Sequence, residues 1–559
     1  MLLPPSFKVR RTLPAGIIGT SLVLCLGYVY FSLHDFIYDH GLSGLSWPSQ
    51  PSSSTPATPS WDLQPLPFPY EYDLNTPASA FCDDRFNRKY LFDLRRTAFQ
   101  YCNASSYSSL TCFHSHTSND DERDSLCMAQ GAVFDAASQK FVLNCDITTP
   151  DENATERGVI PVALVRQYWY DTGPRYIFDN HVSFVEGDQV AGVEKPTVPR
   201  EVRFSLLIKR EGELNPWHCL LEIWSTAMAM DVLQMSRDPA TGYAFLSGVD
   251  RPNVQVVILD DRLDGPYFDL WKLFSGRAPI RLNQIAGNPE AASFYDTANS
   301  TDVEHRLIVP LAGASNPTWQ NDWIARDCTR SDTLRVFVAR VLRHYGIAQT
   351  PAAPVDKLRV TFIDRKDANT RRLADQDQLL EAVRVKYGDT VEVEAVDFGT
   401  LSFAEQLQKA MTTDVLVGVH GAGLTHVMFL REHTSAVVEI QPTDMGAAFM
   451  GFRNIANMRG VSYFRTHATP INETEVAAAA AAVEAAAQET PAEPASEAGE
   501  SGDTPAVEQP SQKRKRVRPV RRAAWHTENF EIGHDTFVRV VGAAIEVVAN
   551  KGTHQKDVA

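Results

Sequence analysis

The sequence lacks several signatures that would fix its chemistry directly. Its eight cysteines include no Cys-X-X-Cys pair, so a structural zinc module is not expected. Neither a P-loop nor a GxGxxG dinucleotide fingerprint occurs. Positive charge is also scarce, since the chain has a formal net charge of −16 and a pI of about 5.4. A protein this acidic is not expected to bind nucleic acid, and any anion site must be built locally from a few basic residues.

An uncharged apolar run covers residues 13–33, and Lys8, Arg10 and Arg11 precede it. About 20 apolar residues are enough for a helix to cross a bilayer. The basic residues before the run predict a cytosolic N-terminus and a lumenal remainder, as in a single-pass type II membrane protein. A cleaved signal peptide is the alternative, but large residues such as Phe36 follow the run where a cleavage site would need small ones.

The cysteines agree with a lumenal location. Five of them crowd one segment, at Cys82, Cys102, Cys112, Cys127 and Cys145. In an oxidising compartment this clustering predicts a disulfide framework. Cys25 lies in the predicted span, so seven remain, and at least one of these is a free thiol or bridges to another chain. N-glycosylation sequons begin at Asn103, Asn153, Asn299 and Asn472.

Two stretches have compositions that cannot build a core. The stretch at 41–70 is rich in Pro and Ser and predicts an extended stem. The stretch at 475–522 combines Ala, Glu and Pro with a basic run that starts at Lys513, and it predicts a disordered insertion. A nuclear signal is the alternative for the basic run, but a membrane anchor argues against it. The C-terminus has no KDEL-type signal, so the Golgi and the endoplasmic reticulum both remain open.

From residue 201 onward, strand-like apolar runs alternate with helical patterns. Strands are expected at 202–208, 254–259, 358–363, 391–396, 415–419 and 436–440, and helices at 216–230, 334–342, 375–386, 403–411 and 537–548. Strand–helix–strand alternation indicates parallel sheets. We therefore expect an α/β fold with two Rossmann-like domains, one before and one after residue 350. The range 76–200 shows no clear period, and its fold cannot be derived from the sequence.

These patterns predict an order of segments along the chain. They are a cytosolic tail at 1–12, a transmembrane signal anchor at 13–33, a stem at 34–75, a cysteine-rich lumenal region at 76–200, an N-terminal Rossmann-like domain at 201–350, a C-terminal Rossmann-like domain at 351–474, a disordered insertion at 475–522, and a C-terminal helix and tail at 523–559.

The strongest chemical motif follows the strand at 415–419. It reads His420-Gly421-Ala422-Gly423-Leu424, a glycine-rich turn that enters a predicted helix. Backbone N–H groups at such a turn suit a phosphate, and ligands of open α/β sheets bind at the carboxyl ends of strands. A tight turn with a packing histidine is the alternative. Arg365, Arg371 and Arg372 form a basic cluster after the strand at 358–363, and a guanidinium can bind a diphosphate through two hydrogen bonds.

Candidate acid–base residues lie in the first expected domain. His218 and Glu222 are four residues apart and share one helix face, where either can serve as a general base. Asp260 and Asp261 end the strand at 254–259 and can act as a base, orient a substrate or hold a divalent cation. The one strict Asp-X-Asp, at 375–377, begins a predicted helix, so no metal site is assigned and a cation is not required.

Four motifs in this order resemble glycosyltransferase family 61. They are Asn215-Pro-Trp-His218-Cys-Leu-Leu-Glu222, Asp260-Asp261 with Asp264-Gly-Pro-Tyr267, Asp364-Arg365-Lys366 with Arg371-Arg372, and His420-Gly421-Ala422-Gly423-Leu424 with Val438-Glu439. The resemblance covers about 200–445. It implies a GT-B arrangement of the two domains, an inverting mechanism, a UDP-sugar donor carrying N-acetylglucosamine or xylose, and a glycoprotein or glycan acceptor. The alternative is a non-catalytic glycan-binding or scaffolding protein on the same frame.

The resemblance also implies roles for single residues. The turn at His420 and the arginine at 365 would face the nucleotide phosphates. Glu439 would contact the ribose or base of the nucleotide. His218 or an acidic neighbour would face the acceptor hydroxyl.

Overall fold

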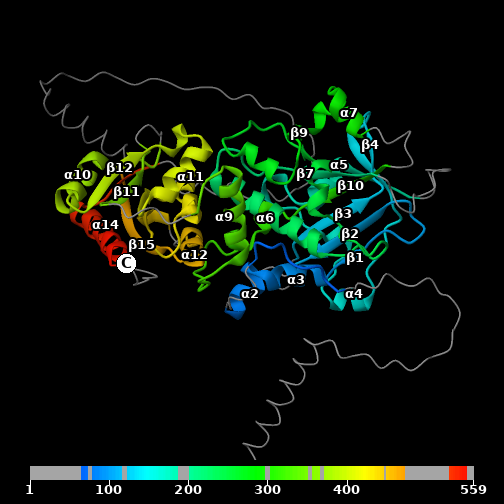
Figure 1. The fold of residues 1–559 in the computed structure, drawn as a ribbon, viewed down its shortest axis with the longest axis horizontal. Coiled ribbons are helices and arrows are strands. Elements are labelled where there is room, and N and C mark those ends of the chain that lie inside the picture. Colours follow the sequence, from blue (N-terminus) through cyan, green and yellow to red (C-terminus); the bar gives the residue numbers. More distant parts are fainter. Residues whose placement is uncertain are drawn as a thin grey trace, which may run out of the picture. The chain divides into compact units, whose positions relative to one another are not determined.

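The computed structural model describes residues 64–72, 79–115, 123–186, 201–295, 303–349, 356–365, 370–445, 449–471 and 528–550 (Figure 1). All of them belong to one compact unit, Trp61–Ala559. The predicted tail, membrane span and insertion lie outside the described residues. Within the described ranges, no helix combines the length and the apolar character needed to cross a membrane.

The first large sheet is mixed and has the strand order β1-β2-β3-β10-β7-β8-β9. Its strands are β1 (Phe99–Gln100), β2 (Ser109–His114), β3 (Ser125–Gln130), β7 (Glu201–Ile208), β8 (Val254–Ile258), β9 (Ile280–Arg281) and β10 (Val303–Val309). β7, β8, β9 and β10 run parallel, and β3 pairs antiparallel with β10. The strands expected at 202–208 and 254–259 are confirmed as β7 and β8.

The cysteine-rich range supplies part of this first sheet. β1, β2 and β3 extend it beyond β10, and a separate three-stranded sheet contains β4 (Val133–Asp135), β5 (Lys140–Asn144) and β6 (Val182–Val185). Every residue of β2 and of β3 is buried. A strand buried on both faces has no alternation of polar and apolar residues, which explains why the sequence showed no period here.

The second large sheet has the order β12-β11-β13-β14-β15-β16. Its strands are β11 (Leu358–Ile363), β12 (Val391–Val396), β13 (Val415–Val419), β14 (Ala436–Pro442), β15 (Ser462–Ile471) and β16 (Asn529–Glu531). All pairs are parallel except β15 with β16. The four strands expected after residue 350 are confirmed. The mixed α/β class is thereby confirmed as well.

Several helices begin at a residue whose side chain caps them. The α-helices are α2 (Ala80–Phe86), α3 (Arg88–Arg96), α4 (Glu152–Glu156), α5 (Pro174–His181), α6 (Pro216–Met235), α7 (Pro289–Tyr295), α8 (Pro317–Gln320), α9 (Asp332–His344), α10 (Gln376–Tyr387), α11 (Phe403–Thr412), α12 (Gly451–Met458) and α14 (His534–Ala549). The side chain of Asn215 caps α6, and that of Ser331 accepts a hydrogen bond from Leu334 N at the start of α9. The expected helices are confirmed, with α6 five residues longer than predicted.

Short 3-10 helices make most of the remaining connections. They are η1 (Val162–Leu164), η2 (Trp169–Asp171), η3 (Gly248–Asn253), η4 (Phe268–Leu273), η5 (Leu282–Gln284), η6 (Gly313–Ser315), η7 (Phe398–Thr400), η8 (Ala422–Phe429) and η9 (Thr443–Met445).

One hydrophobic core joins the two sheets. It runs from α3 and α6 on the first sheet, through α9, to α11, η8 and α12 on the second sheet. Figure 1 shows α6 and α9 between the two sheets. Separate cores lie on the outer faces: one between the first sheet and the β4–β6 sheet, and one between the second sheet and α10 with α14. The N-terminal end of α6 therefore meets the second sheet's glycine-rich turn.

Three disulfides tie the first sheet and its neighbours together. Cys102 pairs with Cys145, and Cys112 with Cys127. Cys82 on α2 pairs instead with Cys328, which lies 246 residues away just before α9. Cys219 is a buried free thiol. The disulfide framework expected from the clustering is confirmed, and so is the unpaired thiol.

Part of the predicted stem packs on the folded unit. Residues 64–72 lie along α6 and α9, where Tyr72 is 5% exposed and donates a hydrogen bond from Oη to Asp231 Oδ2 (2.7 Å). Glu71 lies beside Arg340, with Oε1 3.4 Å from Nε. We call residues 64–72 the strap. Leu66 N also donates a hydrogen bond to Met235 O, and Phe68 packs against the shared core. The Pro- and Ser-rich composition did not indicate this docking.

Candidate functional site

Two arginines lie side by side over the glycine-rich turn of the second sheet. A Cβ added to Gly421 would lie 3.1 Å from Arg371 Nη1 and 3.8 Å from Arg365 Nη1. Within the described ranges neither guanidinium forms an ion pair with a carboxylate, and the Nε of each is buried without a hydrogen-bond partner. Their hydrogen bonds go to backbone carbonyls, from Arg365 Nη2 to Thr370 O (3.3 Å) and from Arg371 Nη1 to His420 O (3.4 Å). Two cations held together with no carboxylate in contact form a candidate anion site.

The pKa values of both arginines are lowered, as expected for two buried cations that lie close together. Burial and the charge of Arg365 lower the pKa of Arg371 to about 10, so both groups remain charged at neutral pH. Burial also lowers the pKa of Arg365, against the opposing effect of Asp397. Arg371 adopts a left-handed backbone conformation, with φ of 60°. Such a conformation costs a non-glycine residue roughly 1 kcal/mol and persists where the surroundings impose it.

Arg372 belongs to a different environment from its neighbours. Its side chain is exposed, while its backbone N donates to Asn529 Oδ1 (3.0 Å) and its carbonyl accepts from Phe530 N. The structure therefore brings Arg365 and Arg371 together at the turn and leaves the Arg372 side chain outside.

The buried carboxylate of Glu439 fixes the His420 ring. Its Nδ1 lies 2.6 Å from Glu439 Oε1, and Tyr463 Oη donates to Glu439 Oε2 at 2.6 Å. Glu439 is fully buried. Both oxygens of the Glu439 carboxylate therefore have a hydrogen-bond partner. Because the carboxylate is buried against the imidazole, Glu439 holds the His420 ring in place and is not exposed at the surface.

The rest of the turn is shaped by close packing. A Cβ on Gly423 would lie 3.2 Å from Ile363 Cγ2, so the turn can lie this close to β11 only without a side chain at that position. Ala422 begins η8, and Leu424 is fully buried in the shared core. The helix expected after the turn is thus a 3-10 helix. Its N-terminus still lies at the carboxyl end of β13, where an anion is favoured.

The second cluster surrounds His218 at the start of α6. The imidazole packs edge-on against Trp319, with ring centroids 4.6 Å apart, and against Tyr170, at 5.1 Å. Its Nδ1 faces Glu211 Oε2 at 3.6 Å, and within the described chain neither atom has a hydrogen-bond partner. The other oxygen of Glu211 accepts from Ala314 N at 2.6 Å. A histidine with one nitrogen aimed at a buried carboxylate is arranged as a general base, and the gap is one that closes on substrate binding in many enzymes.

The sequence did not single out Glu211. It lies just after β7, outside any motif, and its side chain is fully buried. Gly313 offers the one indirect signal, since a Cβ there would come within 2.9 Å of the Glu211 carboxylate. That signal can be interpreted only once the fold is known.

Glu222 lies on the same helix as His218 but in a closed environment. It is 5% exposed, and Oε2 accepts a hydrogen bond from Glu211 N at 3.3 Å. Burial and the charge of Glu211 raise the pKa of Glu222 well above its usual value. A carboxyl enclosed in this way is poorly placed to contact a substrate.

Asp260 and Asp261 occupy different environments. Asp260 binds Arg210 through both oxygens, with Oδ1 2.7 Å from Nη2 and Oδ2 2.9 Å from the backbone N. Burial alone would raise the pKa of Asp260, but the hydrogen bonds and charge of Arg210 hold it below its usual value. Asp261 is exposed and accepts from Asn283 Nδ2 at 3.0 Å. Asp260 thus serves as an anchor for Arg210.

Aromatic rings connect the two clusters across the junction of the sheets. Trp217 packs on Phe449 and on Phe452, with ring centroids 5.4 Å apart in both pairs. His420 lies 5.0 Å from Phe449 and 5.6 Å from Phe452. Gly451 makes the approach possible, because a Cβ there would lie 2.6 Å from Trp217 Cη2. The residue before His218 therefore shares partners with His420.

A further carboxyl, on Asp322, lies at this junction. Asp322 is 7% exposed, and its carbonyl accepts a hydrogen bond from Met450 N. Burial raises its pKa to about 7. It lies three residues after Trp319, the ring that packs on His218. A carboxyl that titrates near neutral pH is a second candidate base.

The described residues do not bring together the ligands that a metal needs. No group of three or more His, Cys, Asp or Glu side chains within them is arranged to hold an ion. Asp377, from the one Asp-X-Asp, lies in the first turn of α10.

Comparison with known proteins finds similarity to one family over part of the chain. Residues 321–437 match the family model described as Glycosyltransferase 61. The EGF domain-specific O-linked N-acetylglucosamine transferase of Drosophila melanogaster is 28% identical over 212 residues, which are 38% of this chain and 37% of that protein. The enzyme of the same name from Mus musculus is 34% identical over 200 residues, 35% of this chain and 34% of that protein. The chain thus aligns with somewhat more than a third of each relative's length.

Removal of the Asp260 charge tests its assignment as an anchor. Because its pKa is lowered in the folded state, Asp260 contributes stability above the unfolded pKa of about 3.9 that is lost as pH falls through the folded pKa. We expect Asp260→Asn to lower the free energy of unfolding by about 3 kcal/mol at pH 7, the scale of a broken buried pair, and by less at pH 3. The measurement is urea unfolding at both values. Asp261→Asn is the matched control, and an equal effect of the two substitutions would contradict the assignment.

Proposed function

Because residues 321–437 match the Glycosyltransferase 61 family model, we propose that this chain is an inverting glycosyltransferase of that family, which uses a UDP-sugar donor and glycosylates a hydroxyl group of a glycoprotein or glycan. We also propose that the two sheets form a GT-B arrangement, with the donor on the second sheet and the acceptor on the first. The paired guanidinium groups of Arg365 and Arg371 are the observation that carries the proposal, because a diphosphate supplies the charge that they lack.

The donor sugar is proposed from the names of the relatives. Those relatives are N-acetylglucosamine transferases, which favours UDP-N-acetylglucosamine over UDP-xylose for this chain. A divalent cation is not required in this proposal, since two guanidinium groups can neutralise the charge that develops on the departing UDP. The names of the relatives also favour an acceptor hydroxyl on an EGF-like domain.

The proposed chemistry is a single displacement. His218 Nε2 takes the proton of the acceptor hydroxyl, whose oxygen attacks the anomeric carbon while the bond from that carbon to the UDP oxygen breaks. The electron pair of the broken bond leaves with UDP, where Arg365 and Arg371 stabilise it. Glu211 stabilises the imidazolium that forms on His218, and Glu439 holds His420 beside the phosphates. The sugar is transferred with inversion.

The proposed location is the lumen of the Golgi or the endoplasmic reticulum, with an N-terminal type II membrane anchor. The three disulfides support an oxidising compartment. Asn153, in one of the predicted sequons, is exposed on α4 and can accept a glycan.

A donor screen with the purified full chain tests the proposal. We expect hydrolysis or transfer of N-acetylglucosamine from UDP-N-acetylglucosamine, and slower turnover of UDP-xylose. The measurement is release of UDP. Binding of UDP without turnover of any UDP-sugar would instead support the alternative, a non-catalytic glycan-binding or scaffolding protein.

The arginine pair allows a matched comparison with a neighbouring arginine, Arg372. Arg365→Ala and Arg371→Ala should each weaken UDP binding by at least tenfold, because each removes charge-assisted hydrogen bonds worth about 1.5–3 kcal/mol. Arg372→Ala should change the affinity by less than twofold, because its side chain lies outside the turn. Isothermal titration calorimetry measures all three. The phosphate site would have to lie elsewhere if Arg372→Ala weakened binding as much as the other two.

The general base is tested by separating turnover from donor affinity. His218→Ala should lower kcat about 10²–10⁴-fold and leave UDP affinity within twofold. Glu211→Gln should lower kcat and shift the acidic limb of its pH profile to lower pH, because the imidazolium loses its carboxylate. If His218→Ala keeps the wild-type kcat while Asp322→Asn removes it, the base is Asp322.

A further inference from the structure

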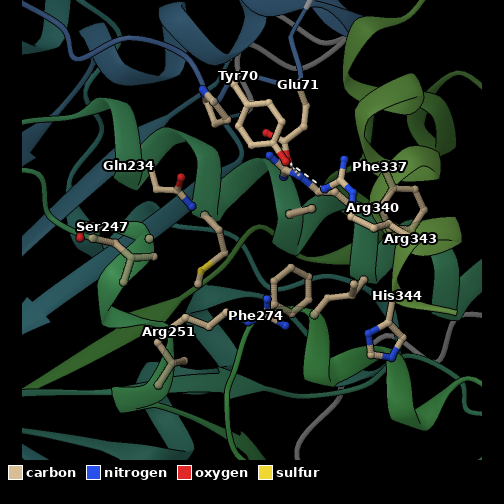
Figure 2. Close-up of a pocket in the computed structure, with 17 residues that line it drawn as sticks. Tyr70, Glu71, Gln234, Ser247, Arg251, Phe274, Phe337, Arg340, Arg343 and His344 are labelled. Atoms are coloured by element: carbon tan, nitrogen blue, oxygen red, sulfur yellow. Dashed lines mark hydrogen bonds and ion pairs between the residues drawn. The ribbon is translucent and has the colours of Figure 1, made fainter. Parts of the chain in front are cut away.

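A cavity lies at the far end of α6 from His218 (Figure 2). It has a volume of about 650 Å³, within the range of pockets that bind ligands. The strap, α6, η3, η4 and α9 all contribute to its wall. The proposed function does not use this cavity.

Its position separates it from the transferase site. Met230 of α6 lines it, 12 residues beyond His218, which corresponds to about 18 Å along a helix. Val254, the first residue of β8, also lines it. The other end of β8 leads to Asp260. The cavity therefore opens at the edge of the first sheet opposite the carboxyl ends of its parallel strands.

The cavity has a surplus of positive charge in an acidic protein. Arg251, Arg340 and Arg343 line it, with Glu71 as the one acidic lining residue. Arg340 is engaged, since Nη1 lies 2.9 Å from Asp231 Oδ1 and Nε lies 3.4 Å from Glu71 Oε1.

The other two guanidinium groups are less engaged than that of Arg340. The Arg343 side chain is 56% exposed and lies 3.4 Å from the same Glu71 oxygen. Arg251 donates to the carbonyl of Lys272 at 2.9 Å and forms no ion pair with any carboxylate in the described ranges. Figure 2 shows Arg251 and Arg343 on different sides of the cavity. A ligand with one anionic group cannot neutralise both, whereas a chain with spaced carboxylates can.

Part of the cavity lining is apolar, and we call this part the floor. It contains Met230, Leu246, Phe274 and Phe337, and Phe274 is 7% exposed. Tyr70 of the strap lies at the mouth and is 84% exposed. This arrangement fits an aromatic or aliphatic side chain with acidic groups on either side of it.

We propose that this cavity binds an acidic segment of polypeptide, with one aromatic or aliphatic side chain in the floor and carboxylates on Arg251 and Arg343. The net charge of −16 does not prevent this, because charges more than about 8 Å away are screened at physiological salt while the two arginines contact the ligand. If the proposed function holds, such a segment would belong to the acceptor protein and would position it at a second point.

Binding of a short peptide to the full chain tests the site without using activity. The probe is a blocked pentapeptide with the sequence Asp-Glu-Phe-Glu-Asp, titrated by calorimetry. We expect saturable binding that the double variant Arg251→Glu/Arg343→Glu weakens at least tenfold. Lys386→Glu, an exposed charge reversal on α10, should change it less than twofold. Replacing Phe of the peptide by Gly should weaken binding at least fivefold, and Gln234→Trp, which fills the cavity from α6, should abolish it.

Three results would overturn the proposal. They are no binding of the pentapeptide at 10 mM, equal binding to the double variant, and binding of UMP that is lost in the double variant, which would assign the cavity to a nucleotide. Turnover of the UDP-sugar donor alone should be unchanged in the double variant. If the wild-type chain binds the peptide but turns over no UDP-sugar donor, the proposed function is rejected and this site remains.

Discussion

Two guanidinium groups held side by side with no carboxylate in contact are the constraint on which the site depends. Arg365 and Arg371 repel each other, and burial adds to the cost, as the lowered pKa of both shows. The fold holds them there through β11, through the strained backbone of Arg371 and through a turn whose glycine leaves room for both. An anion bound between them would relieve both the repulsion and the desolvation. The whole chain has a net charge of −16, so this positively charged site is a local exception to the negative potential of the protein.

The shared core explains how two separate clusters can form one site. The core is continuous from α6 to η8 and α12, so the start of α6 and the glycine-rich turn are fixed relative to each other by packing. Trp217 and His420 contact the same two phenylalanines. Gly451 is the position where a side chain would separate them. The proposed base on one sheet and the proposed phosphate site on the other can then act on one substrate pair.

Much of the fold and part of the site could be predicted from the sequence. The parallel strands after residue 201 were predictable because apolar runs and caps such as Ser331 are local signals. The order of motifs indicated Arg365, His218 and the His420 turn as candidate site residues. It did not indicate what their neighbours do. The sequence made Asp260 a catalytic candidate and could not show its ion pair with Arg210. Glu211 lies in no motif at all. Burial, ion pairs and contacts between distant segments are tertiary properties, so local patterns could not supply them.

The most direct test of the central claim is a structure of the full chain bound to UDP. The account predicts that the β-phosphate lies between the guanidinium groups of Arg365 and Arg371, within hydrogen-bond distance of both and next to Gly421. UDP bound away from these arginines, or bound with its uridine in their place, would contradict it.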